Sequence, residues 1–250
     1  MRSNLKSYRD AAQFYDLFSD NSDIPFYLEI ARRFGSPILE LACGTGRVSI
    51  HLAAAGHDVV GVDTTEEMLA IAARKRDELP LEVRYRLQFL RGDVTDLHLG
   101  GRFPLVIIPS AFHFCISEEQ QLKCLETVKN HMSDTAVFVL DLRPGLATDG
   151  DGEWSDAPVR LDGITVKRYG TYNTDIGRRV QHRTLTVEVV HEDGTVETIQ
   201  TEQAVATLMD EEADALLSIT GFEVIEEYAD WDFGPYVPGM RRRILVLKCH

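Results

Sequence analysis

The chain has 250 residues, of which 44% are hydrophobic, and a formal net charge of −14 at pH 7. This length and composition are typical of one or two globular domains with a sizeable core rather than of a disordered chain. The acidic balance argues against a nucleic-acid partner, which normally requires a basic face, and no apolar run is long enough to span a membrane.

The first 36 residues are expected to form a helical lid segment ahead of the core. Residues 5–34 read as one or two amphipathic helices and are rich in aromatic side chains, namely Tyr8, Phe14, Tyr15, Phe18, Phe26 and Tyr27. The first ten residues lack the apolar run of a signal peptide, and the four cysteines form no C-x-x-C pair. We therefore expect a cytoplasmic protein.

Residues 38–63, ILELACGTGRVSIHLAAAGHDVVGVD, predict a β-strand, a crossover helix and a second, parallel strand. Gly44 and Gly46 fall at the turn from strand to helix, where glycine allows positive φ and a ligand can approach the backbone. Asp63 ends the second strand and can accept hydrogen bonds from both hydroxyls of a ribose. The stretch therefore predicts a site for a nucleotide-like ligand.

A nicotinamide dinucleotide is one ligand for such a turn, but three details argue against it. The third glycine of a dinucleotide fingerprint is replaced by Ser49, and 37 residues precede the first strand. Glu40 lies just before the turn, where a carboxylate suits a cationic ligand better than a pyrophosphate.

The rest of the core alternates in the same way. We expect a helix at 66–78, strands at 83–93 and 103–109, a helix at 120–132 and a fifth strand at 135–142. Residues 143–207 begin with a Gly/Asp/Pro-rich connector and then predict an antiparallel β meander, with the turn EDGT between two of its strands. Residues 208–250 predict a helix that ends at Gly221 and two final strands, with Arg241, Arg242 and Arg243 on a solvated hairpin edge.

Three motifs in order, LELACGTGR, VVGVDTTEEML and RGDVTDL, resemble the core of class I (Rossmann-like) methyltransferases that use S-adenosylmethionine (SAM), over roughly residues 38–142. The resemblance implies that SAM is the cofactor and S-adenosylhomocysteine (SAH) the product. It also implies that Glu40, Ala42, Gly44 and Gly46 line the methionine end of SAM, that Asp63 holds the ribose, that Thr64 and Met68 flank the adenine, and that Asp93 and Val94 meet its amino edge.

Together, pattern and resemblance predict an α/β fold with a doubly wound, seven-stranded, mostly parallel sheet. The expected division is a helical N-terminal lid at 1–36, a SAM-binding core at 37–142, an antiparallel β insertion at 143–207 after strand five, and the last helix and strands at 208–250. Ligands of open α/β sheets bind beyond the carboxyl ends of the strands, so the insertion is expected to roof the site and to enclose a small molecule.

The segment after the fourth strand, residues 109–115, reads PSAFHFC. It matches neither the Pro-Pro-aromatic run of amino-methyltransferases that act on nucleic acids nor the Pro-Cys of enzymes that methylate cytosine carbon. Catechol-type enzymes would place an Asp-Asn pair after strand five, where only Asp141 stands, and no His/Cys ligand spacing occurs elsewhere. We expect no metal site.

His113 is the candidate general base, because a group with a pKa near 7 would help an amine or hydroxyl acceptor to lose its proton. The alternative is a histidine packed between two phenylalanines. Cys115 is not expected to act as a nucleophile. The resemblance to class I methyltransferases also implies that Tyr15 reaches SAM; the alternative is a half-buried aromatic residue that anchors the lid. Residues that could face the acceptor are Arg143, Tyr172, His182, Tyr228 and Trp231.

The sequence thus predicts a SAM-dependent methyltransferase that acts on a nitrogen or an oxygen of a small-molecule acceptor. Three alternatives stay open: an NAD(P)-dependent oxidoreductase, a SAM-binding module without catalysis, and a methyltransferase with a protein substrate. No membrane or nucleic-acid partner is expected. The acceptor and the oligomeric state are left open, a homodimer being one option.

Overall fold

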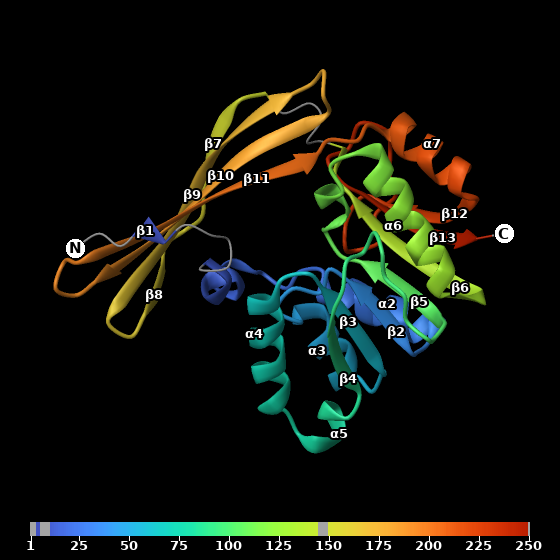
Figure 1. The fold of residues 1–250 in the computed structure, drawn as a ribbon, viewed down its shortest axis with the longest axis horizontal. Coiled ribbons are helices and arrows are strands. Elements are labelled where there is room, and N and C mark those ends of the chain that lie inside the picture. Colours follow the sequence, from blue (N-terminus) through green and yellow to red (C-terminus); the bar gives the residue numbers. More distant parts are fainter. Residues whose placement is uncertain (1–3, 6–10, 145–149, 250) are drawn as a thin grey trace.

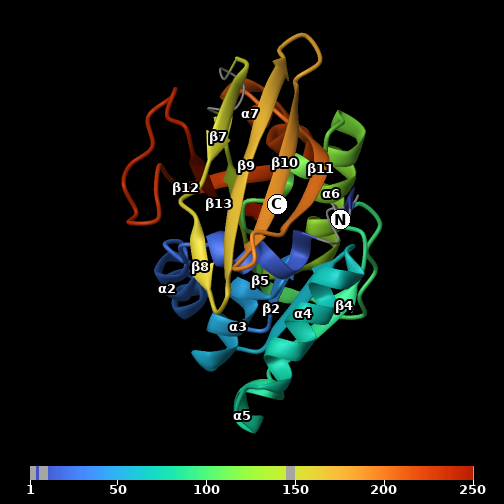
Figure 2. The same ribbon diagram turned by 90° about the vertical axis from the view of Figure 1, so that its left-hand side faces the viewer.

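The structure is a computed structural model that describes residues 4–5, 11–144 and 150–249. It contains two β-sheets with a helical segment between them (Figures 1 and 2). The predicted residues Tyr8 and 145–149 lie outside the described part.

The larger sheet has seven strands in the order β12-β13-β6-β5-β2-β3-β4. The strands of this sheet are β2 (Ile38–Leu41), β3 (Val59–Asp63), β4 (Leu87–Arg91), β5 (Phe103–Ile108), β6 (Met132–Leu142), β12 (Phe222–Tyr228) and β13 (Arg243–Cys249). β13 is antiparallel to both of its neighbours, whereas the pairs among β2 to β6 are parallel. The predicted seven-stranded, mostly parallel sheet is confirmed.

Helices cover both faces of this sheet because alternate strand residues point to opposite sides. On one face, α6 (Glu118–His131) and α7 (Asp210–Thr220) pack on a cluster that includes Val106, Phe138 and Leu245. On the other face, α2 (Ile24–Phe34) and α3 (Arg47–Ala54) pack on a cluster that includes the alternate strand residues Ile107, Val139 and Ile244. Two further helices, α4 (Glu66–Asp77) and α5 (Leu81–Arg84), lie between β3 and β4 in the chain.

The second sheet is formed by the predicted meander. It contains β7 (Gly152–Ser155), β8 (Val159–Leu161), β9 (Ile164–Asp175), β10 (Val180–His191) and β11 (Val196–Ala206), and β1 (Asn4–Leu5) pairs parallel to β11 at one edge. β9, β10 and β11 are antiparallel, as predicted. In Figure 1 this sheet stands to the left of the core, and in Figure 2 it lies in front of it.

The N-terminal segment bridges the two sheets. The 3₁₀ helix η1 (Ala12–Phe18) contributes Phe14, Leu17 and Phe18 to an apolar cluster on the second sheet. The next helix, α2, packs on the core sheet. The prediction of helices across 5–34 is thus wrong for Leu5, which is in a strand, and α2 is the only α-helix among the described residues of that range.

Several predicted boundaries differ from the structure for local reasons. The strand predicted at 83–93 is limited to β4, because Pro80 starts the short helix α5 and the chain turns before Leu87. α6 begins two residues earlier than predicted, where Ser117 and Gln120 form a capping box. Gly221 adopts a φ of 78° at the end of α7, as its predicted role at the helix end requires.

The predicted solvated edge at 241–243 is wrong for Arg243. This residue is only 7% exposed, and its guanidinium donates to Glu227 at 2.9 Å and to Asp214 at 2.7 Å. The guanidinium therefore links β13 to β12 and α7. The sequence contains three consecutive arginines, and nothing in that run indicates that Arg243 is the buried one.

Candidate active site

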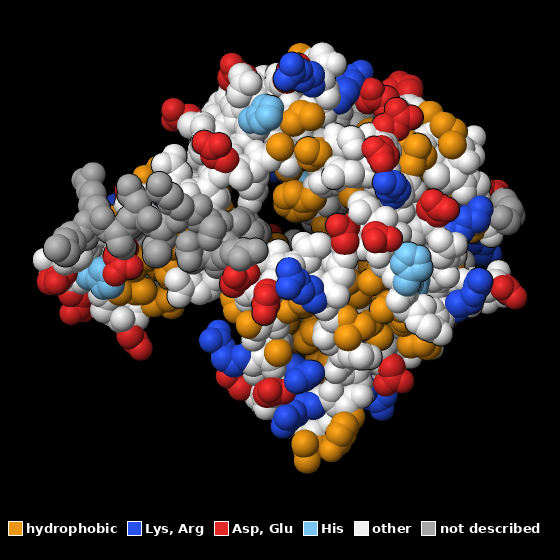
Figure 3. Space-filling model, viewed as in Figure 1, with side chains coloured by type: hydrophobic (Ala, Val, Ile, Leu, Met, Phe, Trp, Pro, Cys, Tyr) orange, Lys and Arg blue, Asp and Glu red, His pale blue; other side chains and the backbone are white. Residues whose placement is uncertain are grey.

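A cavity of about 490 Å³ lies beyond the carboxyl ends of the core strands and is closed on one side by β11. Figure 3 shows a hollow between the two parts of the molecule on this face. This volume lies within the range of small-molecule sites. The wall is formed by Tyr15, Ala42, Asp63, Thr64, Thr65, Met68, Asp93, Val94, Thr95, Pro109, Ser110, Ala111, Phe114, Cys115, Gln120, Gln203 and Ala204.

The glycine turn between β2 and α3 reaches the cavity wall through Ala42, whereas the predicted residues Gly44 and Gly46 are not part of that wall. Gly44 and Gly46 have φ values of 56° and 74°, which side chains disfavour. A Cβ on Gly46 would lie 2.6 Å from the Phe89 ring, whereas one on Gly44 would meet nothing within 4 Å. The absence of a side chain at Gly46 therefore allows the Phe89 ring to pack closely, and its absence at Gly44 leaves the backbone of the turn accessible. Ala42, on the cavity wall, also has a positive φ, 57°.

Asp63 is held by backbone donors on both of its carboxylate oxygens. The N–H of Gly44 donates to Oδ2 and the N–H of Thr65 donates to Oδ1, each at 2.8 Å. The carboxylate thus ties the glycine turn to the start of α4, and its orientation is fixed before any ligand arrives. Lone pairs on both oxygens can still accept from a ligand hydroxyl.

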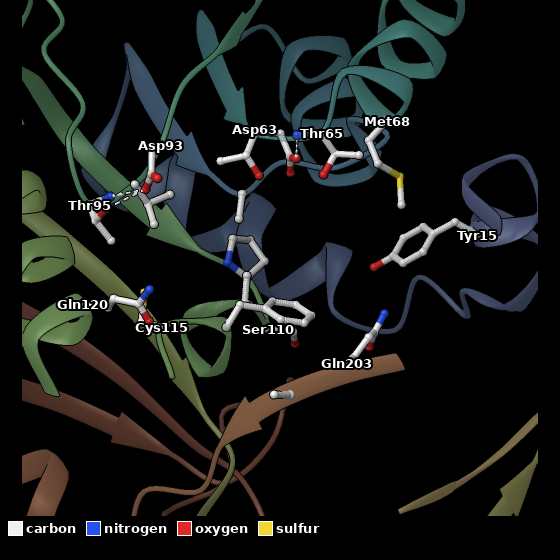
Figure 4. A pocket seen from close by; sticks show the side chains of 17 residues that line it. Tyr15, Asp63, Thr65, Met68, Asp93, Thr95, Ser110, Cys115, Gln120 and Gln203 are labelled. Carbon is white, nitrogen blue, oxygen red and sulfur yellow. Dashed lines mark hydrogen bonds between the residues drawn. The ribbon is translucent and has the colours of Figure 1, made fainter. Parts of the chain in front are cut away.

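Asp93 follows β4, next to β3 in the sheet, and is fixed in a similar way. The backbone N–H and the hydroxyl of Thr95 donate to its Oδ1 at 2.8 and 2.7 Å. In Figure 4, Asp63 and Asp93 stand along one side of the cavity and Ser110 lies opposite them. The wall therefore presents two carboxylate acceptors to hydroxyl or amino groups.

Glu40 does not line the cavity. It is buried in β2, and the hydroxyl of Ser49 donates to its Oε2. Burial raises the pKa of Glu40 to about 7, against the effect of the Ser49 hydrogen bond. Ser49, which distinguishes this turn from a dinucleotide fingerprint, thus supplies the polar partner of Glu40.

The lid segment is fastened to the glycine turn and to α4 through Asp16. The hydroxyl of Thr45 donates to Asp16 Oδ1 at 2.7 Å, and Lys75 Nζ donates to Oδ2 at 2.8 Å. The neighbouring Tyr15 lines the cavity. Figure 4 shows the ring of Tyr15 and the amide of Gln203 pointing toward one another.

His113 lies in η2 (Phe112–Phe114), half-buried, with its ring centroid 4.5 Å from that of Phe114. It is not part of the cavity wall. Burial, followed by the charges of Arg143 and Arg183, lowers the pKa of His113 to about 3. These effects favour the neutral imidazole in the free protein, and the role of His113 as a general base stays a prediction.

None of the five residues named from the sequence as facing the acceptor lines the cavity. Tyr228 and Trp231 instead pack against Phe26 of α2, with ring centroids 6.0 and 5.5 Å from it. The roof residues that reach the cavity are Gln203 and Ala204, which depend on how β11 is placed over the core. No local sequence motif indicates that position of β11, so these two contacts could not be predicted.

A chain of polar groups lies under the cavity floor. Ser110, with a φ of 49°, donates its hydroxyl proton to the buried Asp141 Oδ2 and accepts from Arg143 Nη2 at 3.3 Å. Arg242 Nη1 also donates to Asp141 Oδ2, at 3.2 Å. Positive φ in a residue with a side chain is uncommon and clusters at functional sites.

The described residues contain no group of three or more His, Cys, Asp or Glu side chains placed to hold a metal ion. In that same part of the chain, no helix combines the length and the apolar character that a membrane span requires.

Comparison with known families assigns residues 38–135 to a family described as "Methyltransferase domain". Residues 38–135 of the chain thus match a methyltransferase domain. The predicted family, a SAM-dependent methyltransferase, is thereby confirmed, and SAM is its cofactor.

Similar proteins agree in sequence and in fold. A dTDP-3-amino-3,4,6-trideoxy-alpha-D-glucopyranose N,N-dimethyltransferase of Streptomyces venezuelae is 28% identical over 169 residues, which cover 64% of this chain and 68% of that protein. The CcbJ methyltransferase of Streptomyces caelestis has a TM-score of 0.80 at 20% identity, over 96% of both chains. SAM-bound CalS10, an amino pentose methyltransferase of Micromonospora echinaspora, has a TM-score of 0.70 at 21% identity, over 98% and 99% of the two chains. The second sheet is thus part of the shared fold.

Proposed function

We propose that this chain binds SAM in the described cavity and transfers its methyl group to a nitrogen of a small-molecule acceptor. The observation that carries this proposal is the pair of pre-oriented carboxylates, Asp63 and Asp93, beside a bare glycine turn under a roof. A nucleoside needs such acceptors for its ribose hydroxyls and its adenine amine.

In this proposal SAM lies along the ends of β2, β3 and β4. Asp63 accepts from the ribose hydroxyls, Thr64 and Met68 flank the adenine, and Asp93 and Val94 meet its amino edge. These five residues all line the cavity. The methionine end then lies at the turn formed by Ala42, Gly44 and Gly46.

Glu40 acts on SAM through its charge, from behind the glycine turn. Its carboxylate is buried, so the surrounding low dielectric screens it less than water would. The ammonium and sulfonium groups of SAM are positively charged. When SAM is bound, these charges favour the ionised form of Glu40, whose pKa is about 7. SAM binding is then coupled to proton release from Glu40.

The reaction is an in-line displacement at the methyl group of the sulfonium, in which the acceptor lone pair attacks opposite the sulfur. Tyr15, Gln203 and Ser110 surround the remaining part of the cavity and would position the acceptor. Positioning of this kind can supply much of the rate enhancement. No covalent enzyme intermediate is required.

The low basicity of His113 favours a nitrogen rather than an oxygen as the atom that accepts the methyl group. A neutral amine attacks with its own lone pair and can lose its proton afterwards, whereas a hydroxyl needs a base during the attack. His113, with a pKa of about 3, is a poor acceptor for a hydroxyl proton. The names of two similar proteins, an amino-sugar N,N-dimethyltransferase and an amino pentose methyltransferase, support the same choice for this chain.

The proposed partner is therefore a small amine, and the second sheet, which reaches the cavity through Gln203 and Ala204 of β11, selects it. A cytoplasmic location is supported by the four cysteines, all of which are free thiols. The net charge of −14 argues against a nucleic-acid partner. A homodimer stays a prediction, which light scattering would check.

The test is to incubate the protein with SAM labelled in its methyl group and a fractionated pool of small metabolites, and to identify labelled products by mass spectrometry. We expect a product that carries the label on nitrogen, with one SAH formed per methyl transferred. A label on oxygen would overturn the choice of acceptor atom. Tight SAM binding without any labelled product would instead favour a non-catalytic SAM-binding module.

A further inference from the structure

The short helix η2, which carries His113, contacts both β6 of the core and β11 of the second sheet. Arg143 follows β6 in the core, and Arg183 lies in β10 of the second sheet. Their positive charges both lower the pKa of the imidazole, which places both side chains within its electrostatic reach. Arg143 is called the core cation and Arg183 the roof cation below.

The roof cation lies on the cavity side of its sheet. Arg183 pairs directly with Gln203 across β10 and β11, and side chains of directly paired residues lie on the same face of a sheet. Gln203 lines the cavity and points into it (Figure 4). Arg183 Nε donates to Gln181 Oε1 at 2.6 Å, which holds the guanidinium along the same strand.

The core cation is one hydrogen bond behind the cavity floor. Arg143 Nη2 donates to the hydroxyl of Ser110, which lines the cavity, and that hydroxyl is oriented by its own bond to Asp141. Asp141 is shared with Arg242. Among the described side chains, Arg143 Nε is one of the buried polar atoms that have no hydrogen-bond partner.

An unpartnered donor on a half-buried cation is costly, and native proteins satisfy most such groups with protein, water or ligand. Oxyanions are the ligands that match a guanidinium, because carboxylate and phosphate oxygens accept two of its parallel N–H groups. In a chain of net charge −14, Arg143 bonds to the wall residue Ser110 and Arg183 is paired with the wall residue Gln203, so positive charge stands behind two sides of the cavity.

Resting on the proposed function, we propose that the acceptor carries an oxyanion, a carboxylate or a phosphate, which binds between Arg143 and Arg183 beside the methylated nitrogen. Arg143 is then a specificity-determining residue. Ser110 positions it by accepting from Nη2, and Asp141 acts through Ser110, whose hydroxyl it orients. The acceptor class is an amine with a nearby acidic group.

The experiment uses acetate and inorganic phosphate as probes, titrated calorimetrically into the full chain saturated with SAH, at constant ionic strength. We expect wild type to bind one of these anions. The Arg143→Gln variant should bind it at least about tenfold more weakly, and Arg143→Lys should recover part of the loss because it keeps the charge. Arg183→Gln is the second variant, in case Arg143→Gln does not fold. Arg84→Gln, in the exposed helix α5, is the matched control and should bind the anion as wild type does.

The outcomes are separable. If wild type binds SAH but neither anion, or if Arg143→Gln binds the anion as well as wild type does, the inference is overturned and the proposed function stands. If Arg143→Gln loses affinity for SAH instead, the guanidinium serves the carboxylate of SAM, and the inference is also overturned. If wild type does not bind SAH, the proposed function itself fails. Which anion binds distinguishes a carboxylate-bearing acceptor from a phosphate-bearing one.

Discussion

Asp63 has two tasks in this structure, one toward the protein and one toward the proposed ligand. It accepts from two backbone N–H groups and so fixes the glycine turn against α4. Its exposed lone pairs would accept from the ribose of SAM. We expect Asp63→Ala to weaken SAM binding by at least about 1.5 kcal/mol, because charge-assisted hydrogen bonds to the ribose are lost.

Calorimetry with SAM measures this change, and thermal unfolding separates it from misfolding. Asp58→Ala is the matched control, because Asp58 precedes the same strand but is exposed and pairs with Arg86. A folded Asp63→Ala protein with wild-type affinity would remove Asp63 from the SAM site.

Glu40 makes a prediction about pH. Its pKa of about 7 in the folded protein means that the carboxyl is largely protonated below neutral pH. Binding of cationic SAM favours the ionised form, so affinity should rise from pH 6 to pH 8 by about threefold to tenfold. Calorimetry in two buffers with different ionisation enthalpies should count a fraction of one proton released at pH 7.

Glu40→Gln should abolish both the proton release and this rise in affinity. Glu29→Gln is the control, because Glu29 is on the surface of α2 and pairs with Arg32. A Glu40→Gln variant whose SAM affinity keeps the wild-type pH dependence would contradict the role of Glu40.

His113 makes a prediction about stability. Its folded pKa of about 3 is below the ordinary value of 6.5, so between these values the unfolded chain binds the proton more strongly. The contribution of His113 to stability is therefore present above pH 6.5 and is lost as the pH falls toward 3. Between pH 7 and pH 4.5, wild type should lose about 1–2 kcal/mol more than His113→Gln, the partial exposure of the ring limiting the effect.

Urea unfolding at the two pH values tests this, with the exposed His98→Gln as control. An equal loss for wild type and His113→Gln would show that the imidazole is solvated and titrates normally. In that case His113 would recover the pKa that a general base requires near pH 7.

The individual residues differ in how far the sequence predicts them. Most of the residues predicted to bind SAM line one cavity, because their positions follow from strand ends and from a local turn. The burial of Glu40 and its bond to Ser49 depend on packing between β2 and α3. The pKa of His113 depends on Arg143 and Arg183, which are distant in sequence, so a local motif cannot reveal it.

At the scale of elements, η1 is the part whose attachment can be tested most simply. Asp16 joins it to the glycine turn through Thr45 and to α4 through Lys75. The ion pair is partly exposed, so the effect of breaking it should be modest. We expect Asp16→Ala to raise the dissociation rate of SAM about threefold to tenfold with little change in association, because Tyr15 is held less firmly over the cavity.

Stopped-flow displacement of SAM measures both rates. Asp20→Ala is the control, because Asp20 lies in the same segment and bonds only to Ser22 among the described contacts. An unchanged dissociation rate in Asp16→Ala would show that η1 does not restrain the ligand.

The elements themselves follow from sequence where the pattern is local and fail where tertiary contacts decide. Alternation of apolar runs with amphipathic stretches predicts the core strands and α3, α4, α6 and α7. The pairing of Leu5 with β11 and the 3₁₀ form of η1 arise from contact with the second sheet, which lies far along the chain. The amphipathic pattern of the N-terminal segment is also compatible with an α-helix. It therefore does not distinguish an α-helix from the observed strand and 3₁₀ helix.

At the scale of the whole molecule, a seven-stranded sheet supplies the SAM-binding edge and a second sheet covers it. The lid segment packs on both sheets, so the cavity has walls from the core, from η1 and from β11. The core is expected to bind the cofactor, and the covering parts are expected to choose the acceptor. The order of elements was predictable from the sequence, but the contact of Gln203 and Ala204 with the cavity was not.

The most direct test of this account is a calorimetric titration of the wild-type chain with SAH and, separately, with NADH. The account predicts that SAH saturates one site per chain, that NADH produces no binding heat, and that SAM competes with SAH for that site. Binding of NADH together with no binding of SAH or SAM would contradict the assignment of the cavity and the methyl-transfer chemistry built on it.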